Sequence, residues 1–223
     1  MQLRQYQIDN ANILTEIIKK YRIAAFVAEM RVGKTLTSLQ VAFLLSKKNV
    51  LFVTKKKAIS SIENDYKNFN YKYKLTVTNY EQLHNLKDEF DFIICDECHS
   101  LGQYPLPSNR AINLKKISVN KDVLLLSGTI SPESYSQLFH QFWISSFGPW
   151  NQFKNFYAWH KFYGIPSVKF LYNKQINDYS KTKKELIFSE PRNFSIRITS
   201  FNSGVGKRSF KYSSFLRSLG LKL

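Results

Sequence analysis

The chain has 223 residues, of which 43% are hydrophobic and 15% aromatic, a composition that indicates a folded globular domain and excludes a disordered chain. Its formal net charge of +17 favours a polyanionic partner. The sequence contains no long apolar run, either internally or at the N-terminus, so we expect an intracellular, cytoplasmic protein without a membrane partner.

The first 127 residues alternate amphipathic stretches of helical period with short apolar runs. Strands separated by helices predict a parallel sheet that is covered by helices on both faces, which is an α/β fold. In chain order, the predicted elements are helix 8–20, strand 22–28, helix 35–46, strand 50–54, helix 58–69, strand 74–78, short helix 80–86, strand 91–95, helix 109–117 and strand 123–127.

The pattern changes after this alternation. Residues 133–147 and 152–163 have a helical period and are dense in aromatic side chains. We interpret these aromatics as core residues packed against the sheet, although stacking on single-stranded nucleic acid is an alternative. No element is predicted with any clarity from about residue 181 onward. Residues 191–223 contain seven basic residues and no acidic one, so they form a basic tail whose order the sequence does not determine.

The two cysteines of the chain, Cys95 and Cys98, have the C-x-x-C spacing of a redox pair or of half a zinc site. A structural zinc site needs two more ligands at suitable spacing, and the sequence offers no second pair. Cys95 also ends an apolar run. We therefore expect two reduced thiols, with Cys95 buried in a strand.

A phosphate-binding loop is predicted at residues 28–35, which lie between a predicted strand and a predicted helix. Gly33 lets the backbone approach phosphate groups, and the N–H groups at the helix start attract them. Lys34 supplies a positive charge for the β and γ phosphates of a nucleotide, and Thr35 a hydroxyl for magnesium. The usual pattern begins with glycine, whereas this one begins with Ala28.

A second signal is the carboxylate pair Asp96-Glu97, which follows the apolar strand 91–95. Ligands of open α/β sheets bind at the carboxyl ends of the strands. Asp96 could therefore hold hydrated magnesium, and Glu97 could orient or deprotonate an attacking water. The alternative is an acidic cap at the end of a strand.

Together these motifs resemble those of the superfamily 2 helicases. Residues 96–99, Asp-Glu-Cys-His, are similar to their DEAD/DEAH-type motif II, and residues 127–129, Ser-Gly-Thr, to motif III. Residues 3–7, Leu-Arg-Gln-Tyr-Gln, resemble the Q-motif, while residues 52–55 and 78–81 resemble motifs Ia and Ib.

The phosphate loop itself is most similar to the Swi/Snf-like branch, in which an acidic–methionine pair precedes the loop and the first glycine is commonly missing. Residues 131–135 and the aromatic stretches after them look like the compact helicases encoded by phages. The resemblance implies a RecA-like ATP-binding lobe over residues 1–150, an aromatic helical extension over 151–190 and the basic tail. For a phage protein, the location would be the host cytoplasm.

The resemblance also implies roles for individual residues. Lys34 and Glu97 would be catalytic, and Thr35 and Asp96 would hold magnesium. His99, Ser127 and Thr129 would couple the nucleotide site to nucleic acid, which Lys55 and Thr78 would contact. The residues that would bind ATP are Arg4, Gln7, which would read the adenine edge, Glu29, Met30, Arg31, Val32, Gly33, Lys34 and Thr35.

Members of this superfamily have two RecA-like lobes, and the second supplies an arginine finger that stabilises the transferring phosphoryl group. The chain is too short to form a second such lobe after residue 183. We therefore expect a first lobe only, completed either by a longer product or by a partner chain.

The expected function is that of an ATP-dependent DNA helicase or translocase, on duplex or single-stranded DNA. The alternative is a basic nucleic-acid-binding module whose nucleotide site is vestigial. A nucleotide kinase would also use a phosphate loop, but the Asp-Glu-x-His pattern is not typical of such kinases.

Overall fold

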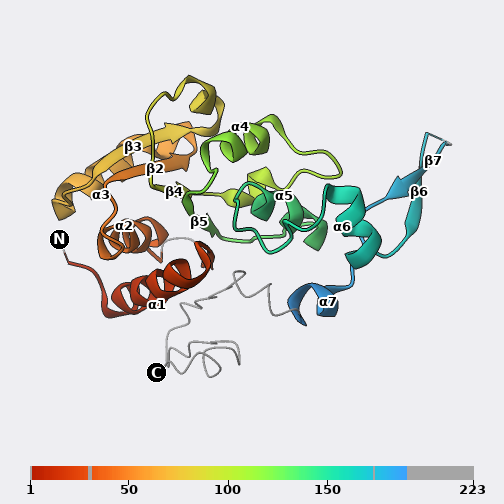
Figure 1. The fold of residues 1–223 in the computed structure, drawn as a ribbon, viewed down its shortest axis with the longest axis horizontal. Helices are drawn as coiled ribbons and strands as arrows, with labels where there is room; N and C mark the ends of the chain where they lie inside the picture. The colour runs from red at the N-terminus through yellow and green to blue at the C-terminus, as the bar shows by residue number, and fades with distance from the viewer. Residues whose placement is uncertain (1, 30–31, 173, 190–223) are drawn as a thin grey trace.

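A computed structural model describes residues 2–29, 32–172 and 174–189 of the chain. Its centre is a five-stranded parallel sheet with the order β1-β5-β4-β2-β3 (Figure 1). The predicted parallel sheet is therefore confirmed. The strands are β1 (Ile23–Val27), β2 (Asn49–Thr54), β3 (Lys74–Asn79), β4 (Phe92–Cys95) and β5 (Asp122–Ser127).

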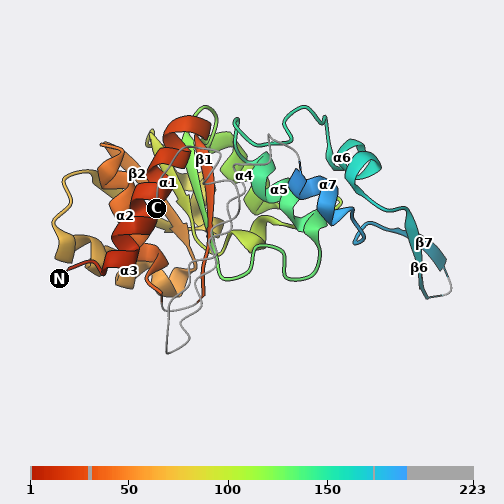
Figure 2. The same cartoon turned by 90° about the horizontal axis from the view of Figure 1, so that it is seen from below.

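Helices cover both faces of this sheet (Figures 1 and 2). One face carries α1 (Gln5–Tyr21), α2 (Lys34–Leu44) and α3 (Ile59–Phe69). The other carries α4 (Asn109–Ile117) and α5 (Leu138–Trp143), together with the 3₁₀ turns η2 (Tyr80–Asn85) and η3 (Cys98–Leu101). A further 3₁₀ turn, η1 (Lys56–Ala58), leads from β2 into α3.

The two faces give the domain two hydrophobic clusters. In β4, Phe92 and Ile94 point into the cluster beneath α1 and α2, whereas Ile93 and Cys95 point into the cluster beneath α5. Successive side chains of a strand alternate between the faces, so a strand buried on both faces needs an unbroken apolar sequence. This requirement is why the short apolar runs of the sequence predict the strands so well.

The cysteines lie inside this core. Cys95 and Cys98 are free and buried, and burial raises the pKa of both thiols. Within the part of the chain that the structure describes, no group of three or more histidine, cysteine, aspartate or glutamate side chains is placed to hold a metal ion.

The aromatic stretches after β5 form shorter helices than the sequence predicts. The expected helix 133–147 is a 3₁₀ turn, η4 (Tyr135–Gln137), followed by α5, and the expected helix 152–163 is α6 (Phe156–Tyr163). The Asn155 side chain accepts from the Ala158 N–H and so starts α6 late, while Pro149 between the helices lacks an N–H and excludes a continuous helix.

Most of these aromatic side chains are core residues, as the sequence predicts. The fully buried set is Phe139, Phe142, Phe156, Trp159 and Tyr163. Tyr157 and Phe162 remain exposed at the surface of α6.

The three elements that follow α6 were not predicted. An antiparallel hairpin of β6 (Ser167–Leu171) and β7 (Lys174–Asp178) follows α6, and α7 (Lys184–Ser189) follows the hairpin. The basic tail 191–223 lies outside the described residues. Across the ranges that the structure describes, no helix is both long enough and apolar enough to cross a membrane.

A buried histidine makes the stability of this aromatic region sensitive to pH. The His140 ring packs against Phe156 and its Nδ1 donates to the Gln103 carbonyl over 2.6 Å, and burial lowers the pKa of His140 to about 4. Since this folded-state pKa lies below the unfolded value, stability from neutral His140 is complete above about pH 6.5 and is lost as the pH falls toward 4. We expect a loss of about 3 kcal/mol in the free energy of unfolding across this window.

Denaturant titrations at several pH values would measure this loss. The variant His140→Gln should remove the part of the pH dependence that His140 contributes, whatever its effect on stability at neutral pH, while His160, whose pKa burial also lowers, keeps its own part. The exposed His84 is the matched control, and His84→Gln should leave the dependence intact. Equal pH profiles for wild type and His140→Gln would contradict the assignment.

Candidate nucleotide site

The motif residues meet at one edge of the sheet. Strands β1, β5, β4 and β2 are neighbours and run parallel, so the segments that leave their carboxyl ends lie side by side. These ends are Val27, Ser127, Cys95 and Thr54, and they lead into the phosphate loop, the Ser-Gly-Thr segment, the carboxylate pair and Lys55. Pairing in the sheet therefore gathers residues that lie up to about 100 positions apart in the sequence.

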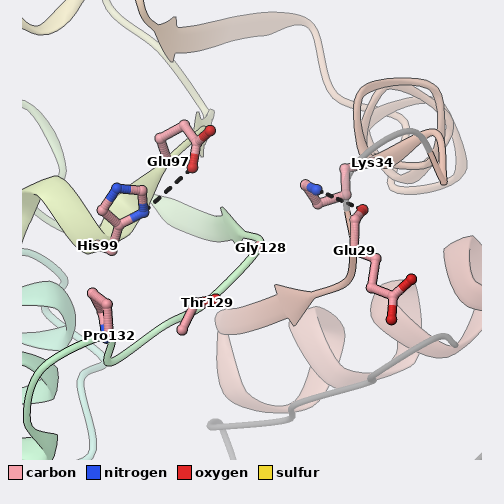
Figure 3. Close-up of a pocket in the computed structure, with 7 residues that line it drawn as sticks. All are labelled: Glu29, Lys34, Glu97, His99, Gly128, Thr129 and Pro132. Atoms are coloured by element: carbon pink, nitrogen blue, oxygen red, sulfur yellow. Dashed lines mark hydrogen bonds and ion pairs between the residues drawn. The ribbon is translucent and has the colours of Figure 1, made fainter.

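The phosphate loop ends at Gly33, which has φ +80° and precedes the first turn of α2. This left-handed conformation favours glycine, and a Cβ atom here would lie 2.0 Å from Gln7 Nε2. Lys34 Nζ donates to the carbonyl oxygen of Ala28 over 2.8 Å and to that of Glu29 over 2.9 Å, the second of which is drawn in Figure 3. The lysine thus folds back over its own loop. Met30 and Arg31, which the sequence assigns to ATP binding, lie outside the described residues.

The Q-motif residues pack directly behind this loop. Gln7 is buried, its amide nitrogen lies against Gly33, and its Oε1 accepts from the backbone N–H of Arg4 over 2.8 Å. Arg4 is the exposed N-cap of α1, and its backbone carbonyl accepts in turn from the Gln7 N–H over 2.9 Å, so Gln7 caps the start of that helix with its side chain. Val32 is buried in the cluster beneath α1 and α2. Gln7 and Val32 therefore support the phosphate loop from the side of α1.

Asp96 lies at the end of β4, with its carboxylate held by the neighbouring strand. Thr54 Oγ1 donates to Asp96 Oδ2 over 2.8 Å, and the Tyr80 hydroxyl donates to the Asp96 backbone carbonyl over 2.6 Å. Burial raises the pKa of Asp96, and the hydrogen bond from Thr54 opposes that shift. The sequence assigned no role to Thr54, which holds the carboxylate of Asp96 from 42 positions away, or to Tyr80, which holds its backbone carbonyl from 16 positions away.

The buried carboxylate of Asp96 should lower the free energy of unfolding when it is ionised. Because the folded-state pKa is raised, the cost of ionised Asp96 is complete above that pKa and vanishes below the unfolded value. Asp96→Asn should therefore raise the melting temperature near pH 7, by about 2–4 °C for each kcal/mol recovered, and the gain should disappear in acid. Thermal unfolding at both pH values tests this, with the exposed Asp88→Asn as control; destabilisation by Asp96→Asn at neutral pH would contradict it.

Glu97 begins a chain of polar contacts that crosses two strand ends. His99 Nδ1 lies 3.3 Å from Glu97 Oε2 and 3.1 Å from Ser127 Oγ. Ser127 Oγ donates to the Thr129 carbonyl over 2.7 Å and accepts from the Thr129 N–H over 3.2 Å. Since the only hydroxyl proton of Ser127 is used on Thr129, His99 Nδ1 carries the proton and donates. The three residues assigned to coupling are thus connected to Glu97.

Glu97 has a backbone conformation that is unusual for its residue type. Its φ of 51° and ψ of 45° are left-handed, a region that costs a residue with a side chain roughly 1–2 kcal/mol. Such strain concentrates at functional sites, where the surrounding structure enforces it. Here the left-handed conformation turns the chain sharply after Asp96. The carboxylate of Asp96 therefore contacts Thr54, whereas that of Glu97 lies near His99 and Lys55.

A cavity of about 670 Å³ separates Lys34 and Glu29 on one side from Glu97 and His99 on the other (Figure 3). Gly128, Thr129 and Pro132 form its remaining wall. Gly128 and Pro132 were not predicted as site residues, although both lie in segments that carry the family resemblance. The volume is large enough for a nucleotide, since ligand pockets commonly measure about 300–1,000 Å³.

The two residues assigned to nucleic-acid contact lie on different strands. Lys55 Nζ is 3.8 Å from Glu97 Oε1, so this exposed lysine lies at the rim of the nucleotide cavity. Thr78 is buried near the end of the edge strand β3, where it pairs with Val53 of β2. Lys55 is therefore accessible to nucleic acid and is also placed to act on Glu97, whereas the Thr78 side chain is largely covered.

Thr35 and Asp96 supply hydroxyl and carboxylate oxygens, the hard ligands that magnesium prefers, and Oδ2 of Asp96 is already fixed by Thr54. The N-terminus of α2 and Lys34 supply positive charge for phosphate groups. The donor set therefore fits a magnesium nucleotide. A phosphate loop opposite strand-end carboxylates, on a five-stranded parallel sheet with helices on both faces, is the arrangement of a RecA-like helicase lobe.

Comparison with known protein families supports this assignment of the lobe. Residues 1–80 and 54–132 match the sequence profile of the family described as type III restriction enzyme, res subunit, and the two ranges together span more than half of the chain. The chain belongs to this family. No curated protein sequence matches the chain.

Solved structures show the same fold. The SWI2/SNF2 ATPase core of Sulfolobus solfataricus in complex with double-stranded DNA has a TM-score of 0.65 and 14% identity, and the match covers 90% of this chain and 45% of that one. The ATPase core domain of the same organism, in a second structure, has a TM-score of 0.58 and 15% identity, over 73% and 38%. The present chain thus spans less than half the length of either.

Proposed function

We propose that this chain is the ATP-binding lobe of an ATP-dependent DNA helicase or translocase, which hydrolyses ATP when a second RecA-like lobe completes the site. The observation that carries this proposal is the cavity that faces Lys34 on one side and the Glu97–His99–Ser127 contacts on the other. A site built only for binding would not need a carboxylate positioned opposite the phosphate loop and linked to a neighbouring strand end.

In the proposed reaction, each of the site residues has a separate role. Lys34 exchanges two bonds to neutral carbonyls for bonds to phosphate oxygens, which are stronger because both partners are charged. Thr35 and Asp96 would hold magnesium, which would neutralise phosphate charge. Glu97 accepts a proton from, or orients, the attacking water, while His99 and Lys55 hold its carboxylate in place.

The same contacts suggest how nucleotide state reaches nucleic acid. A change at Glu97 moves His99, and through Ser127 it moves the segment that begins at Thr129. Similarity of residues 28–35 to the Swi/Snf-like branch, and of residues 131–135 to phage helicases, supports a DNA track in a compact enzyme. The second lobe, in cis or in trans, would add the arginine finger.

The test is a titration of the chain with a fluorescent ATP analogue and magnesium, with and without duplex DNA, followed by a phosphate-release assay. Saturable, magnesium-dependent binding with little turnover is the expected result for a first lobe without its arginine. An absence of nucleotide binding under all conditions would overturn the proposal.

The second candidate is a basic nucleic-acid-binding module with a vestigial nucleotide site. The net charge of +17 favours it, as do the two carbonyl bonds of Lys34, which could lock the loop. It predicts steeply salt-dependent DNA binding that ATP does not change. An effect of ATP on DNA affinity would exclude it.

A further inference from the structure

The β6–β7 hairpin extends from the body at the end of the molecule opposite α2 and α3 (Figures 1 and 2). Exposure increases along it, from the half-buried Ser167 and Asp178 at its base to Phe170, at 74% exposed, and Tyr172, at 92%, near its tip. A two-stranded hairpin is at best marginally stable alone in water. The tip of the hairpin therefore adds little to the hydrophobic core, and contacts at its base must hold the two strands in place.

The base is firmly attached to the segment that follows the nucleotide cavity. The hydroxyl of Ser134 donates to the Ser180 carbonyl, and that of Ser136 donates to the Tyr179 carbonyl over 2.5 Å. Asp178 accepts from the Ser180 backbone N–H over 3.1 Å and from its hydroxyl over 3.0 Å. Ser134 lies two residues after Pro132 of the cavity wall, so the β6–β7 hairpin and the nucleotide site are attached to the same short segment.

The strand register divides the side chains of the hairpin between two faces. Val168 pairs with Asn177 and Phe170 with Gln175, so these four side chains lie on one face. Lys169 and Lys174 lie on the other face, since they occupy the alternate positions. One face thus presents an exposed aromatic ring between amide groups, and the other presents cations.

The surroundings of the hairpin are strongly basic. Residues 161–184 contain six lysines and a single acidic residue, Asp178, whose carboxylate is already bonded to Ser180. A groove of about 490 Å³ runs from the base of the hairpin to α6. Its lining combines apolar and aromatic groups with polar ones, including the one carboxylate of this region: His160, Lys161, Pro166, Ser167, Val168, Asn177, Asp178 and Tyr179.

We propose that the β6–β7 hairpin and the groove at its base bind a nucleic-acid strand with unpaired bases, with Phe170 as a stacking platform and Lys169 and Lys174 as phosphate contacts. The inference rests on the proposed function and adds the kind of nucleic acid that is bound. Exposed aromatics interleaved with lysines favour unpaired bases, because stacking requires a free base face whereas paired bases already stack on one another. Phosphate contacts alone would not explain an exposed phenylalanine.

Binding of the full chain to a fluorescent thymidine oligonucleotide and to a hairpin duplex tests the proposal. Phe170→Leu keeps an apolar side chain but removes the ring, and it should weaken binding of the oligonucleotide roughly tenfold without changing duplex binding. Because Phe170 is largely exposed, the variant should keep the wild-type melting temperature.

The double variant Lys169→Ala/Lys174→Ala should lower the salt dependence of oligonucleotide binding, by about 0.7 in log–log slope for each phosphate that the protein no longer neutralises. The matched control is Lys67→Ala/Lys72→Ala, which removes the same charge from exposed positions at and just after α3, near the far end of the molecule. The control should keep the wild-type slope.

Three results would overturn the inference. If wild type binds the oligonucleotide but both hairpin variants bind it equally well, only the role of the hairpin fails. If the lysine variant loses affinity while Phe170→Leu does not, the contact is to phosphates and stacking is wrong. If wild type binds neither nucleic acid, the DNA-binding part of the proposed function fails as well.

Discussion

Lys34→Ala is expected to abolish detectable nucleotide binding by this chain. The lysine is the cation of the phosphate loop that lines the cavity, and its amine lies over the loop at the first turn of α2. A hydrogen bond to a charged group contributes about 1.5–3 kcal/mol, so the removal of each bond to phosphate should weaken binding roughly 10- to 150-fold. Titration with a fluorescent ATP analogue and magnesium measures the effect directly.

Two controls make this result interpretable. Lys19→Ala removes an exposed lysine that pairs with Glu16 on α1, and it should bind nucleotide like wild type. The Lys34 variant itself should melt near the wild-type temperature, because it gives up two hydrogen bonds to backbone carbonyls that water can replace. Wild-type nucleotide affinity in a folded Lys34→Ala chain would refute the assignment of the phosphate loop.

Glu97→Gln should have a different effect, with nucleotide binding retained and hydrolysis abolished. An amide keeps an oxygen that can accept from His99, so the local contacts can persist, but it cannot take a proton from water. General-base contributions of about 10²–10⁴-fold set the expected decrease in turnover. Phosphate release should be measured in a two-lobe assembly that contains this chain, where the wild-type rate is high enough to show the decrease.

The matched control is Glu81→Gln, since Glu81 is an exposed carboxylate that pairs with Arg110 outside the cavity. It should hydrolyse ATP at the wild-type rate. Unchanged turnover in Glu97→Gln would assign the water to another group, and weaker ATP binding in this variant would indicate that Glu97 holds the nucleotide rather than the water.

The sequence predicts the sheet and the phosphate loop because both depend on local patterns. A strand buried on two faces requires an unbroken apolar run, and Gly33-Lys34-Thr35 between a strand and a helix is recognisable from spacing alone. The roles of Thr54 and Tyr80 could not be predicted in this way, since their bonds to Asp96 depend on strand order. The contact from His99 to Ser127 likewise spans 28 positions and needs the β4–β5 pairing.

The hairpin was missed for a related reason. Its strands have only five residues each. Residues 167–170 of β6 do alternate polar and apolar side chains, but β7 contains a single apolar residue, Ile176, so the periodic signal is too short and weak to predict a hairpin. What fixes them is the hydrogen bonding of Ser134 and Ser136 to Ser180 and Tyr179 across more than 40 positions. Interactions at that distance leave no periodic signal in the sequence.

The burial of both cysteines makes the folded chain nearly inert to thiol reagents. Only a thiolate attacks a maleimide, and Cys95 and Cys98 are inaccessible and held in the protonated form. A single cysteine introduced at an exposed position could therefore carry a fluorescent dye without removal of the native residues. Conversely, the rate at which the unlabelled wild type consumes a maleimide would report how often the core opens.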